Sequence, residues 1–304
     1  MPRRASSPDR DQVEHALANP METTMKLTQL LASAAIVVTL PFAAQADSTE
    51  NKAFVLEALE NTLLAGDVEA VERYFGADIT QHNEMFANGI EAQKGVVGFL
   101  SGKGNFKAEY VRVIADDDLV AVHARYEGFG PTAMIAFDVF RVEEGKIVEH
   151  WDNLIAEQPA NPSGHSQIDG ATQITDLDRT EANKAKVAEF LTRVMIKHEE
   201  IDITQYISPV TYIQHNPSVA DGLDGFGAFM GEMAAKGITM EYTQVHQVIG
   251  EGNFVLTMSE GTFGGQPQAF YDLFRLEDGL IVEHWDVIAP MPGPDAPHNE
   301  AGKF

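Results

Sequence analysis

One sixteen-residue string occurs twice in this chain of 304 residues, and the repeat constrains the fold more than any other feature. Phe137–Asp152 has the sequence FDVFRVEEGKIVEHWD, and Tyr271–Asp286 has the sequence YDLFRLEDGLIVEHWD; eleven of the sixteen positions are identical at an offset of 134. Upstream, Gln81-His82-Asn83 returns as Gln214-His215-Asn216. This period is far longer than the roughly 20–50 residues of solenoid and propeller repeats. The repeat therefore predicts two copies of one domain.

Each copy is predicted to begin with helices and to continue as a run of strands. In copy one, the spacing of apolar residues predicts helices at 54–64, 68–75 and 89–100, and strands at 79–83, 106–114, 119–126, 132–142 and 146–155. In copy two, it predicts helices at 181–197 and 225–235, and strands at 212–216, 238–249, 253–263, 267–277 and 280–288. Helices followed by antiparallel strands indicate an α+β fold with the helices packed on one face of a curved sheet.

Composition places the boundaries of these copies. Residues 47–156 are expected to form the first domain and residues 180–290 the second. Residues 157–179 contain two prolines, two glycines and scattered polar residues, which is typical of a linker. Residues 291–304 are expected to be a tail, and residues 1–46 to precede the fold.

Residues 1–46 are predicted to be an over-extended gene start followed by a signal peptide at about 25–46. Met25 is followed by one lysine, the apolar stretch Leu27–Leu40 and the small-residue cleavage site Ala44-Gln45-Ala46. The apolar stretch is short for a membrane span, although an N-terminal anchor is the alternative. We therefore expect a periplasmic or secreted protein.

Charge and cysteine content exclude several classes of function. The formal net charge is −25, and it survives cleavage because residues 1–46 carry four basic and four acidic residues. Such acidity argues against binding to nucleic acid or to anionic membranes. The chain has no cysteine, which excludes disulfides, thiol nucleophiles and thiolate metal sites.

Three strings in copy two, with parallel strings in copy one, carry a family resemblance. They are Tyr212–Pro217 (YIQHNP), Ser259–Gly265 (SEGTFGG) and Tyr271–Asp286. Both copies resemble the SnoaL-like branch of the nuclear transport factor 2 superfamily. The resemblance implies two tandem cone-shaped α+β domains, each a curved, mostly antiparallel sheet with helices on one face and an apolar pocket at the open end.

The resemblance also implies cofactor-free chemistry, because SnoaL-like members are aldol cyclases that act on polyketide carbonyl compounds. The superfamily also includes isomerases, epoxide hydrolases, dehydratases and non-catalytic binders, and fold alone does not choose among them.

Strand alternation groups the residues that can do chemistry. Asp272, His284 and Asp286 share one face of the last hairpin, and Trp285 lies on the other. The resemblance implies that the first face lines the cone. A desolvated Asp272 can donate a proton or a hydrogen bond to a carbonyl oxygen, while His284 with Asp286 can act as the base. The equivalent catalytic candidates in copy one are Asp138, His150 and Asp152.

A second group is predicted to contact the substrate. His215 and Asn216 in copy two come from a strand at the cone mouth and can contact a substrate oxygen. Asn216 cannot accept a proton, which argues against simple isomerase chemistry. The other predicted substrate contacts are His82 and Asn83 in copy one, and His123 and Glu260, which each occur in one copy only.

The function that these residues favour is cofactor-independent acid/base catalysis on a small, mostly apolar carbonyl-type compound. Aldol or retro-aldol reaction, cyclisation, dehydration and hydrolysis all remain open. The alternative is a periplasmic binding protein that uses the same pockets without turnover. A purely structural Asp-His network and a facial-triad metal site are further alternatives, although no metal or other cofactor is expected. Beyond a small-molecule partner, an internal pseudo-dimer with Trp151 and Trp285 near its interface, or a homodimer, is anticipated.

Overall fold

The computed structural model describes residues 47–293 and 301–304. The predicted gene start and signal peptide lie outside the described residues. Within those two ranges, no helix is long and apolar enough to cross a bilayer.

Copy one begins with helix α1 (Ser48–Leu59), which continues into the π-helical turn η1 (Glu60–Leu64). Its other elements are α2 (Val71–Tyr74), β1 (Phe75–Gln81), α3 (Ile90–Lys103), β2 (Lys107–Asp116), β3 (Leu119–Glu127), β4 (Met134–Glu143) and β5 (Lys146–Ala156). The strands form one five-stranded sheet of order β1-β5-β4-β3-β2, in which only β1 and β5 run parallel.

Copy two repeats this topology. Its elements are η2 (Leu177–Arg179), α4 (Thr180–Phe190), η3 (Leu191–Ile196), η4 (Ile203–Gln205), β6 (Ile213–Gln214), α5 (Gly222–Ala235), β7 (Met240–Glu251), β8 (Phe254–Phe263), β9 (Gln266–Glu277) and β10 (Leu280–Pro290). The sheet order is β6-β10-β9-β8-β7, again with one parallel pair at β6 and β10. The predicted α+β fold with two similar domains is confirmed.

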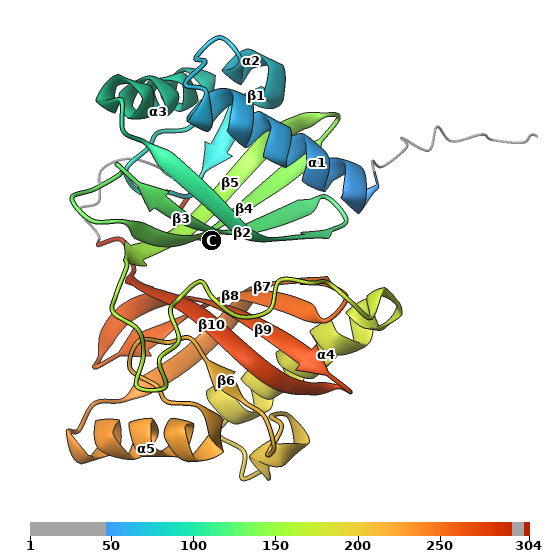
Figure 1. Ribbon diagram of the computed structural model, residues 1–304, viewed down its shortest axis with the longest axis vertical. Helices are drawn as coiled ribbons and strands as arrows, with labels where there is room; N and C mark the ends of the chain where they lie inside the picture. The colour runs from blue at the N-terminus through green and yellow to red at the C-terminus, as the bar shows by residue number, and fades with distance from the viewer. Residues whose placement is uncertain (1–46, 294–300) are drawn as a thin grey trace, which may run out of the picture. The chain divides into compact units, whose positions relative to one another are not determined.

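Each sheet has one face covered by the helices of its own copy (Figure 1). A separate apolar cluster fills the space between helices and sheet in each copy, around Val55, Leu59 and Tyr74 in copy one and around Phe190, Tyr242 and Phe274 in copy two. A third cluster joins the outer faces of the two sheets. It contains Ile135, Phe137, Trp151, Phe254, Leu256, Tyr271, Leu273 and Trp285.

The last hairpin of each copy has the same tight turn. Glu144 and Gly145 have φ angles of 49° and 70°, and Asp278 and Gly279 have φ angles of 50° and 79°. Two successive residues with positive φ are what a two-residue type I′ hairpin turn requires, and its twist matches that of the flanking strands. The turn begins the pairing of β4 with β5 and of β9 with β10, and a register shift just beyond each turn then sets which residues of the two strands face each other.

Several predicted elements differ in extent from the structure. The strand expected at 79–83 is β1, which begins at Phe75 and ends at Gln81. The strand expected at 212–216 is only the two-residue β6, and Pro217, which cannot donate a ladder hydrogen bond, limits its extension beyond Asn216. The helix expected at 181–197 is an α-helix only to Phe190 and then widens into η3. Copy one has the equivalent widening at η1.

Candidate active site

Two aspartates face each other across one rung of each sheet. Asp272 on β9 is the direct partner of Asp286 on β10, and Asp138 on β4 is the direct partner of Asp152 on β5. All four side chains are buried. Like charges at directly opposite positions are unfavourable, so the surroundings must supply protons or donors to these carboxylates.

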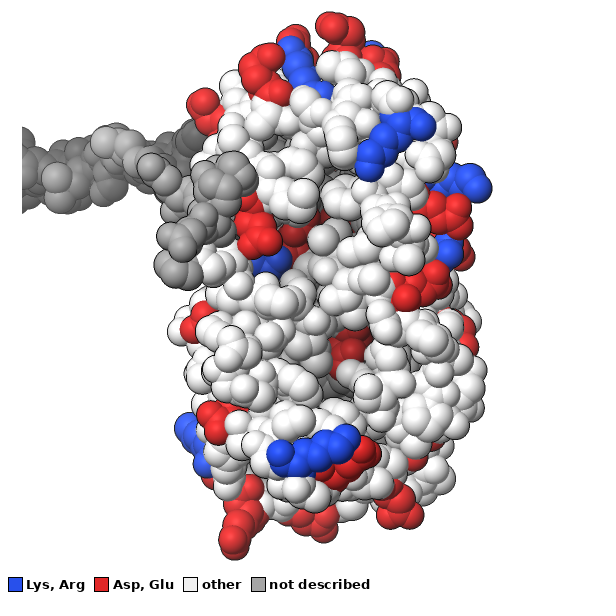
Figure 2. Space-filling model, turned by 90° about the vertical axis from the view of Figure 1, so that its left-hand side faces the viewer, with Lys and Arg blue, Asp and Glu red and all other residues white. Residues whose placement is uncertain are grey.

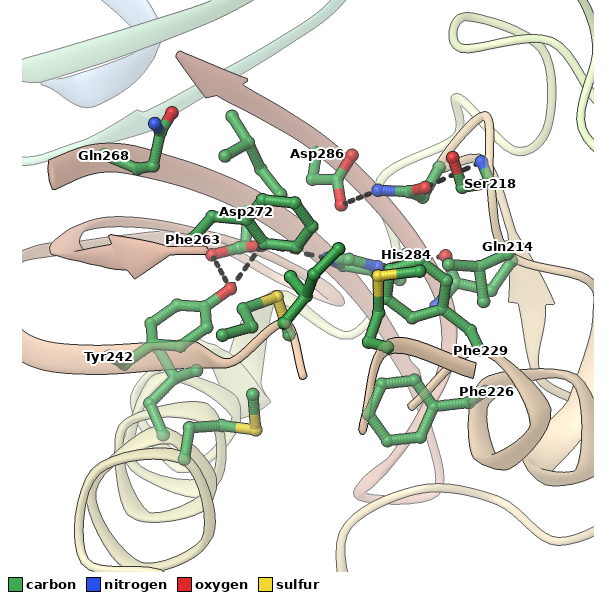
Figure 3. Close-up of a pocket in the computed structure, with 18 of the residues that line it drawn as sticks. Gln214, Ser218, Phe226, Phe229, Tyr242, Phe263, Gln268, Asp272, His284 and Asp286 are labelled. Atoms are coloured by element: carbon green, nitrogen blue, oxygen red, sulfur yellow. Dashed lines mark hydrogen bonds and ion pairs between the residues drawn. The ribbon is translucent and has the colours of Figure 1, made fainter. Parts of the chain in front are cut away.

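In copy two, three side chains supply them, and a fourth contacts the histidine (Figure 3). His284 Nε2 lies 3.1 Å from Asp272 Oδ1. The hydroxyl of Tyr242 lies 3.2 Å from each oxygen of the same carboxylate. Asn216 donates to Asp286 Oδ2 at 2.7 Å. The fourth is Gln214, whose Oε1 lies 3.1 Å from His284 Nδ1.

Copy one contains the same network. His150 Nε2 lies 3.2 Å from Asp138 Oδ1, and its Nδ1 lies 2.9 Å from Gln81 Oε1. The second carboxylate, Asp152, accepts from Asn83 Nδ2 at 2.5 Å. The tyrosine differs, because here Tyr126 on β3 donates to Asp138 Oδ2 at 2.7 Å.

The hydrogen bonds of His284 determine where its protons lie. Gln214 Nε2 donates to the hydroxyl of Tyr212 at 2.8 Å, which leaves Gln214 Oε1 to accept from His284 Nδ1–H. A single proton then lies between His284 Nε2 and Asp272. The pair is therefore an imidazolium with a carboxylate, or a neutral imidazole with a carboxylic acid.

Burial and neighbouring charges shift the pKa values of this site. Burial would lower the pKa of His284, but the hydrogen bond to Asp272 and the charges of Asp286 and Asp272 outweigh it and raise that pKa above its usual 6.5. Burial raises the pKa of Asp286 above its usual 3.8; the charge of His284 opposes this shift, and the charge of Asp272 adds to it. In copy one, burial is the main cause that raises the pKa of Asp138.

The site in copy two opens into a cavity of about 580 Å³. Asp272, His284 and Asp286 lie at one side of this cavity, and Phe226 and Phe229 face them from α5 (Figure 3). The remaining wall is mostly apolar and includes Phe190, Leu191, Met195, Met233, Ile238, Met240, Phe263, Phe274 and Ile288. A largely apolar cavity with a few convergent polar groups is the usual form of a small-molecule site. The equivalent cavity of copy one measures only about 50 Å³.

Comparison with known proteins identifies the fold family. A family model described as a SnoaL-like domain matches residues 55–150 and again residues 187–284, which together are more than half of the chain. The chain belongs to the SnoaL-like family. Both SnoaL-like matches fall inside the two structural copies, and each ends at the histidine of the repeated His-Trp-Asp string.

Solved structures resemble one SnoaL-like copy at a time. TsrD from Streptomyces laurentii is 17% identical, with 34% of this chain and 89% of that chain covered and a TM-score of 0.30. An epoxide hydrolase from M. tuberculosis is 24% identical, with coverages of 36% and 84% and a TM-score of 0.31. A SnoaL-like polyketide cyclase from Agrobacterium tumefaciens is 12% identical, with coverages of 34% and 91% and a TM-score of 0.31. Among curated proteins, none matches the chain.

The structure brings together the six residues predicted to be catalytic, three in each SnoaL-like copy. It changes one pairing, because His284 contacts Asp272 rather than forming a base unit with Asp286. Asn216 lines the larger cavity, and Asn83 contacts the equivalent carboxylate in copy one.

The other predicted substrate contacts lie elsewhere. His215 and His82 point to the outer face of their sheets, where their rings stack on Trp285 and Trp151 at 4.6 and 4.8 Å. His123 stacks on Phe137 on the outer face of its sheet. Glu260 is absent from the cavity wall and lies 3.5 Å from His246. Alternation is the reason for the first two positions: neighbouring strand residues point to opposite faces, so His215 cannot share a face with Gln214 and Asn216.

Gln81, Gln214, Tyr126 and Tyr242 are site residues that the sequence analysis did not select. The glutamines stand in the repeated Gln-His-Asn string, so the repeat was a sufficient signal for them. The two tyrosines occupy non-equivalent strands, β3 and β7, so comparing the copies gives no signal for them.

Among residues 47–293 and 301–304, three clusters have side chains of the types that bind metal ions. They are Asp138 with His150 and Asp152, Asp272 with His284 and Asp286, and His165 with Asp169 and His215; in each, the ligand atoms lie within 4.8 Å of one another. In the first two clusters both ring nitrogens of the histidine already face protein oxygens. A metal ion would therefore have to displace the Gln or the Asp that holds the ring.

Basic side chains are not concentrated at one place on the visible surface. On the face shown in Figure 2, Lys and Arg stand at separate positions among more numerous Asp and Glu. This distribution agrees with the net charge of −25.

Proposed function

We propose that this SnoaL-like protein is a cofactor-independent acid/base enzyme that acts on a small, neutral, mostly apolar carbonyl compound in the cavity of copy two. The observation that carries the proposal is the position of Asp272, His284 and Asp286 at the wall of a ligand-sized apolar cavity. An anionic ligand would lie against the buried Asp272 and Asp286, and the lining residues Lys236 and Glu232 already pair with each other at 2.6 Å. Because the rest of the wall is mostly apolar, a neutral ligand is favoured.

The proposed chemistry is proton abstraction next to a carbonyl group. Asp286, as a carboxylate, takes a proton from the carbon adjacent to the carbonyl, and the electron pair of the broken C–H bond forms the C=C bond of an enol. The proton held between His284 and Asp272 moves to the carbonyl oxygen, which accepts it with the former C=O π pair. The enol carbon can then attack a second carbonyl carbon with its C=C π pair. The enol O–H returns its proton to the Asp272–His284 pair as its C=O re-forms, and the oxygen of the attacked carbonyl takes its former C=O π pair and the proton held by Asp286. The reverse sequence breaks a C–C bond.

Burial supports these roles. A desolvated carboxylate with a raised pKa is a stronger base than one in water, and positioned acid/base groups contribute about 10²–10⁴-fold to a rate. The raised pKa of His284 keeps a transferable proton on the Asp272–His284 pair near neutral pH.

Proton exchange of a model ketone tests the proposal. The methyl protons of 2-acetyl-6-fluoronaphthalene would be followed by proton NMR in D₂O, with binding followed separately by fluorine NMR. We expect saturable exchange that falls by about 10²-fold or more in Asp286→Asn and His284→Gln. The matched controls are Asp278→Asn in a hairpin turn and His198→Gln at an exposed position, which should exchange like the wild type. Binding without exchange above the buffer rate would contradict catalysis and favour the binding-protein alternative.

A further inference from the structure

The two copies keep the same acid/base network but differ about tenfold in cavity volume, roughly 580 Å³ against 50 Å³. A space of 50 Å³ holds only one or a few water molecules. The Asp, His and Asp residues that the two copies share therefore do not explain why copy one is closed.

The first cause is an exchange of residues across one rung. In copy two, Tyr242 on β7 lies opposite Gly261 on β8, whereas in copy one Ala108 on β2 lies opposite Tyr126 on β3. The two positions are equivalent. In copy two, Gly261 is four residues after Thr257, the β8 partner of Asp272; in copy one, Tyr126 is four residues after Val122, the β3 partner of Asp138. The same phenol therefore reaches the aspartate from different strands.

In copy one, this phenol comes from the strand next to the aspartate. Tyr126 is buried, stacks on Phe106 at 5.8 Å and lines what is left of the cavity. In copy two, the corresponding position is Gly261, which has no side chain to enter the cone. Tyr242 instead lies against Phe270 at 4.4 Å, and the cavity stays open.

The second cause is the helix over the mouth of the cone. In copy one, α3 buries Gln93, Val96, Val97 and Leu100, and three of these residues line the small cavity. In copy two, none of the residues of α5 is buried against the described part of the chain. Phe226, Phe229 and Met233 of α5 border the open cavity instead.

We propose that the chain binds one ligand, in copy two, and that Tyr126 together with the docked helix α3 closes copy one to ligands. Copy one then keeps Asp138, His150 and Asp152 as a hydrogen-bonded core. The inference rests on the proposed function in one respect, that the ligand binds in the cavity of copy two. It does not require that the ligand is turned over.

Binding stoichiometry tests this inference. The probe is 2-acetyl-6-fluoronaphthalene, titrated into the full chain and followed by fluorine NMR and calorimetry. We expect one equivalent for the wild type, one weaker equivalent for Ile288→Trp, which narrows the cavity of copy two, and one of unchanged affinity for the matched control Ile288→Val. Two equivalents in the wild type, or one equivalent whose affinity Ile288→Trp leaves unchanged, would overturn the proposal. If the wild type binds one equivalent of the ketone but does not exchange its protons, the proposed function is contradicted and the binding inference still stands.

The role of Tyr126 has a test of its own. Tyr126→Ala removes the phenol and should add a second binding equivalent with a separate fluorine resonance, whereas Tyr126→Phe keeps the ring and should not. If Tyr126→Ala does not fold, Tyr126→Leu replaces it. A folded variant without the phenol ring that still binds one equivalent would show that Tyr126 does not close copy one.

Discussion

Asp286 meets Asp272 side by side on a buried rung, and both lie at the wall of the cavity. Hydrogen bonds from Asn216 and Tyr242 and the proton shared with His284 make this arrangement possible. In the proposed reaction, Asp286 must be without a proton to act as the base, whereas His284 must hold a proton to act as the donor.

The pH dependence of ketone exchange follows from these pKa shifts. We expect a bell-shaped profile whose rising limb lies above the ordinary carboxyl value of 3.8, because the pKa of Asp286 is raised. The falling limb should lie above 6.5, because the pKa of His284 is raised and its proton is lost only at higher pH. Initial exchange rates between about pH 4 and 10 would measure both limbs.

Variants distinguish the two limbs. Asp286→Asn should lower the rate by about 10²-fold or more and remove the rising limb from the residual activity. Asp278→Asn serves as the control and should keep both limbs. A rate that does not vary with pH across this range would contradict the acid and base roles of both residues.

At the scale of single residues, the sequence predicted that Asp272, His284 and Asp286 lie together, and it misplaced His215. Asp272, His284 and Asp286 were placed on one face because residues alternate along β9 and along the part of β10 that follows the register shift between Ile281 and Glu283. The same rule, applied to Gln214-His215-Asn216, selects Gln214 and Asn216 and rejects His215. His215 was predicted to contact the substrate because histidine commonly carries protons, but alternation places its side chain on the outer face.

Strand β7 was predicted, but two of its details could not be: its register with β8 and its close approach to β8. Its pairing with β8 shifts register twice, between Tyr242 and Gln244 and between Val245 and Gln247, whereas β2 shifts only once. A Cβ atom on Gly261 would lie 1.9 Å from the main-chain oxygen of Glu241. The close approach of two backbones therefore requires glycine here, and no local sequence pattern reports such an approach.

Replacing this glycine should destabilise copy two. We expect Gly261→Ala to lower the free energy of unfolding by about 1–3 kcal/mol, because the β7 backbone has to move away from the new methyl group. Urea unfolding followed by circular dichroism measures the change. The control is Gly231→Ala on α5, where nothing in the described structure lies within 4 Å of the added Cβ and where alanine should stabilise the helix by about 0.5–1 kcal/mol. Equal effects of the two substitutions would disprove the close-approach argument.

Most strands and helices were predictable because their signals are local. The hairpins follow from Glu144-Gly145 and Asp278-Gly279, and the strands between them follow from runs of apolar residues. The π-helical turns η1 and η3 were not predicted, since widening of a helix depends on packing against the sheet. The difference in cavity volume has the same origin, because it depends on pairs of residues far apart in the sequence.

The described part of the whole molecule is held together by the outer faces of its two sheets. Besides the shared apolar cluster, Asn153 on β5 donates to the main-chain oxygens of Val287 and Ala269 at 2.7 and 3.1 Å. Arg112 of copy one lies 4.0 Å over the ring of Trp285 and donates to main-chain oxygens of the linker at Ala171 and Ile168. Burial lowers the pKa of Arg112 to about 10, which still leaves it charged at neutral pH.

Loss of the Asn153 contacts should weaken both copies together. We expect Asn153→Val to cost about 1–3 kcal/mol, because two buried carbonyl oxygens lose a donor. Thermal unfolding by calorimetry should still show a single transition, at a lower temperature. The control is Asn105→Val at an exposed position, which should change the stability by no more than about 0.5 kcal/mol. Two separated transitions in the Asn153 variant would show that the copies unfold independently.

The segments that follow the two last strands lie on opposite copies. After copy one, the linker places the main-chain oxygen of Ser166 at 2.8 Å from His215 of copy two. After copy two, the main-chain oxygen of Gly302 lies 2.9 Å from His82 of copy one, and Lys303 donates to the main-chain oxygen of Asp152 at 2.6 Å. The segment that follows each copy therefore contacts the other copy at the histidine of its Gln-His-Asn string.

Asn153 and Val287 occupy equivalent positions at an offset of 134, and they meet across the contact between the sheets. In a dimer of identical subunits related by a two-fold axis, both positions would have to hold the same residue. Joining the copies in one chain removes that restriction, so an amide on one side can bond a carbonyl on the other. Because equivalent positions of the two copies can hold different residues, substitutions that open the cavity of copy two need not open the cavity of copy one.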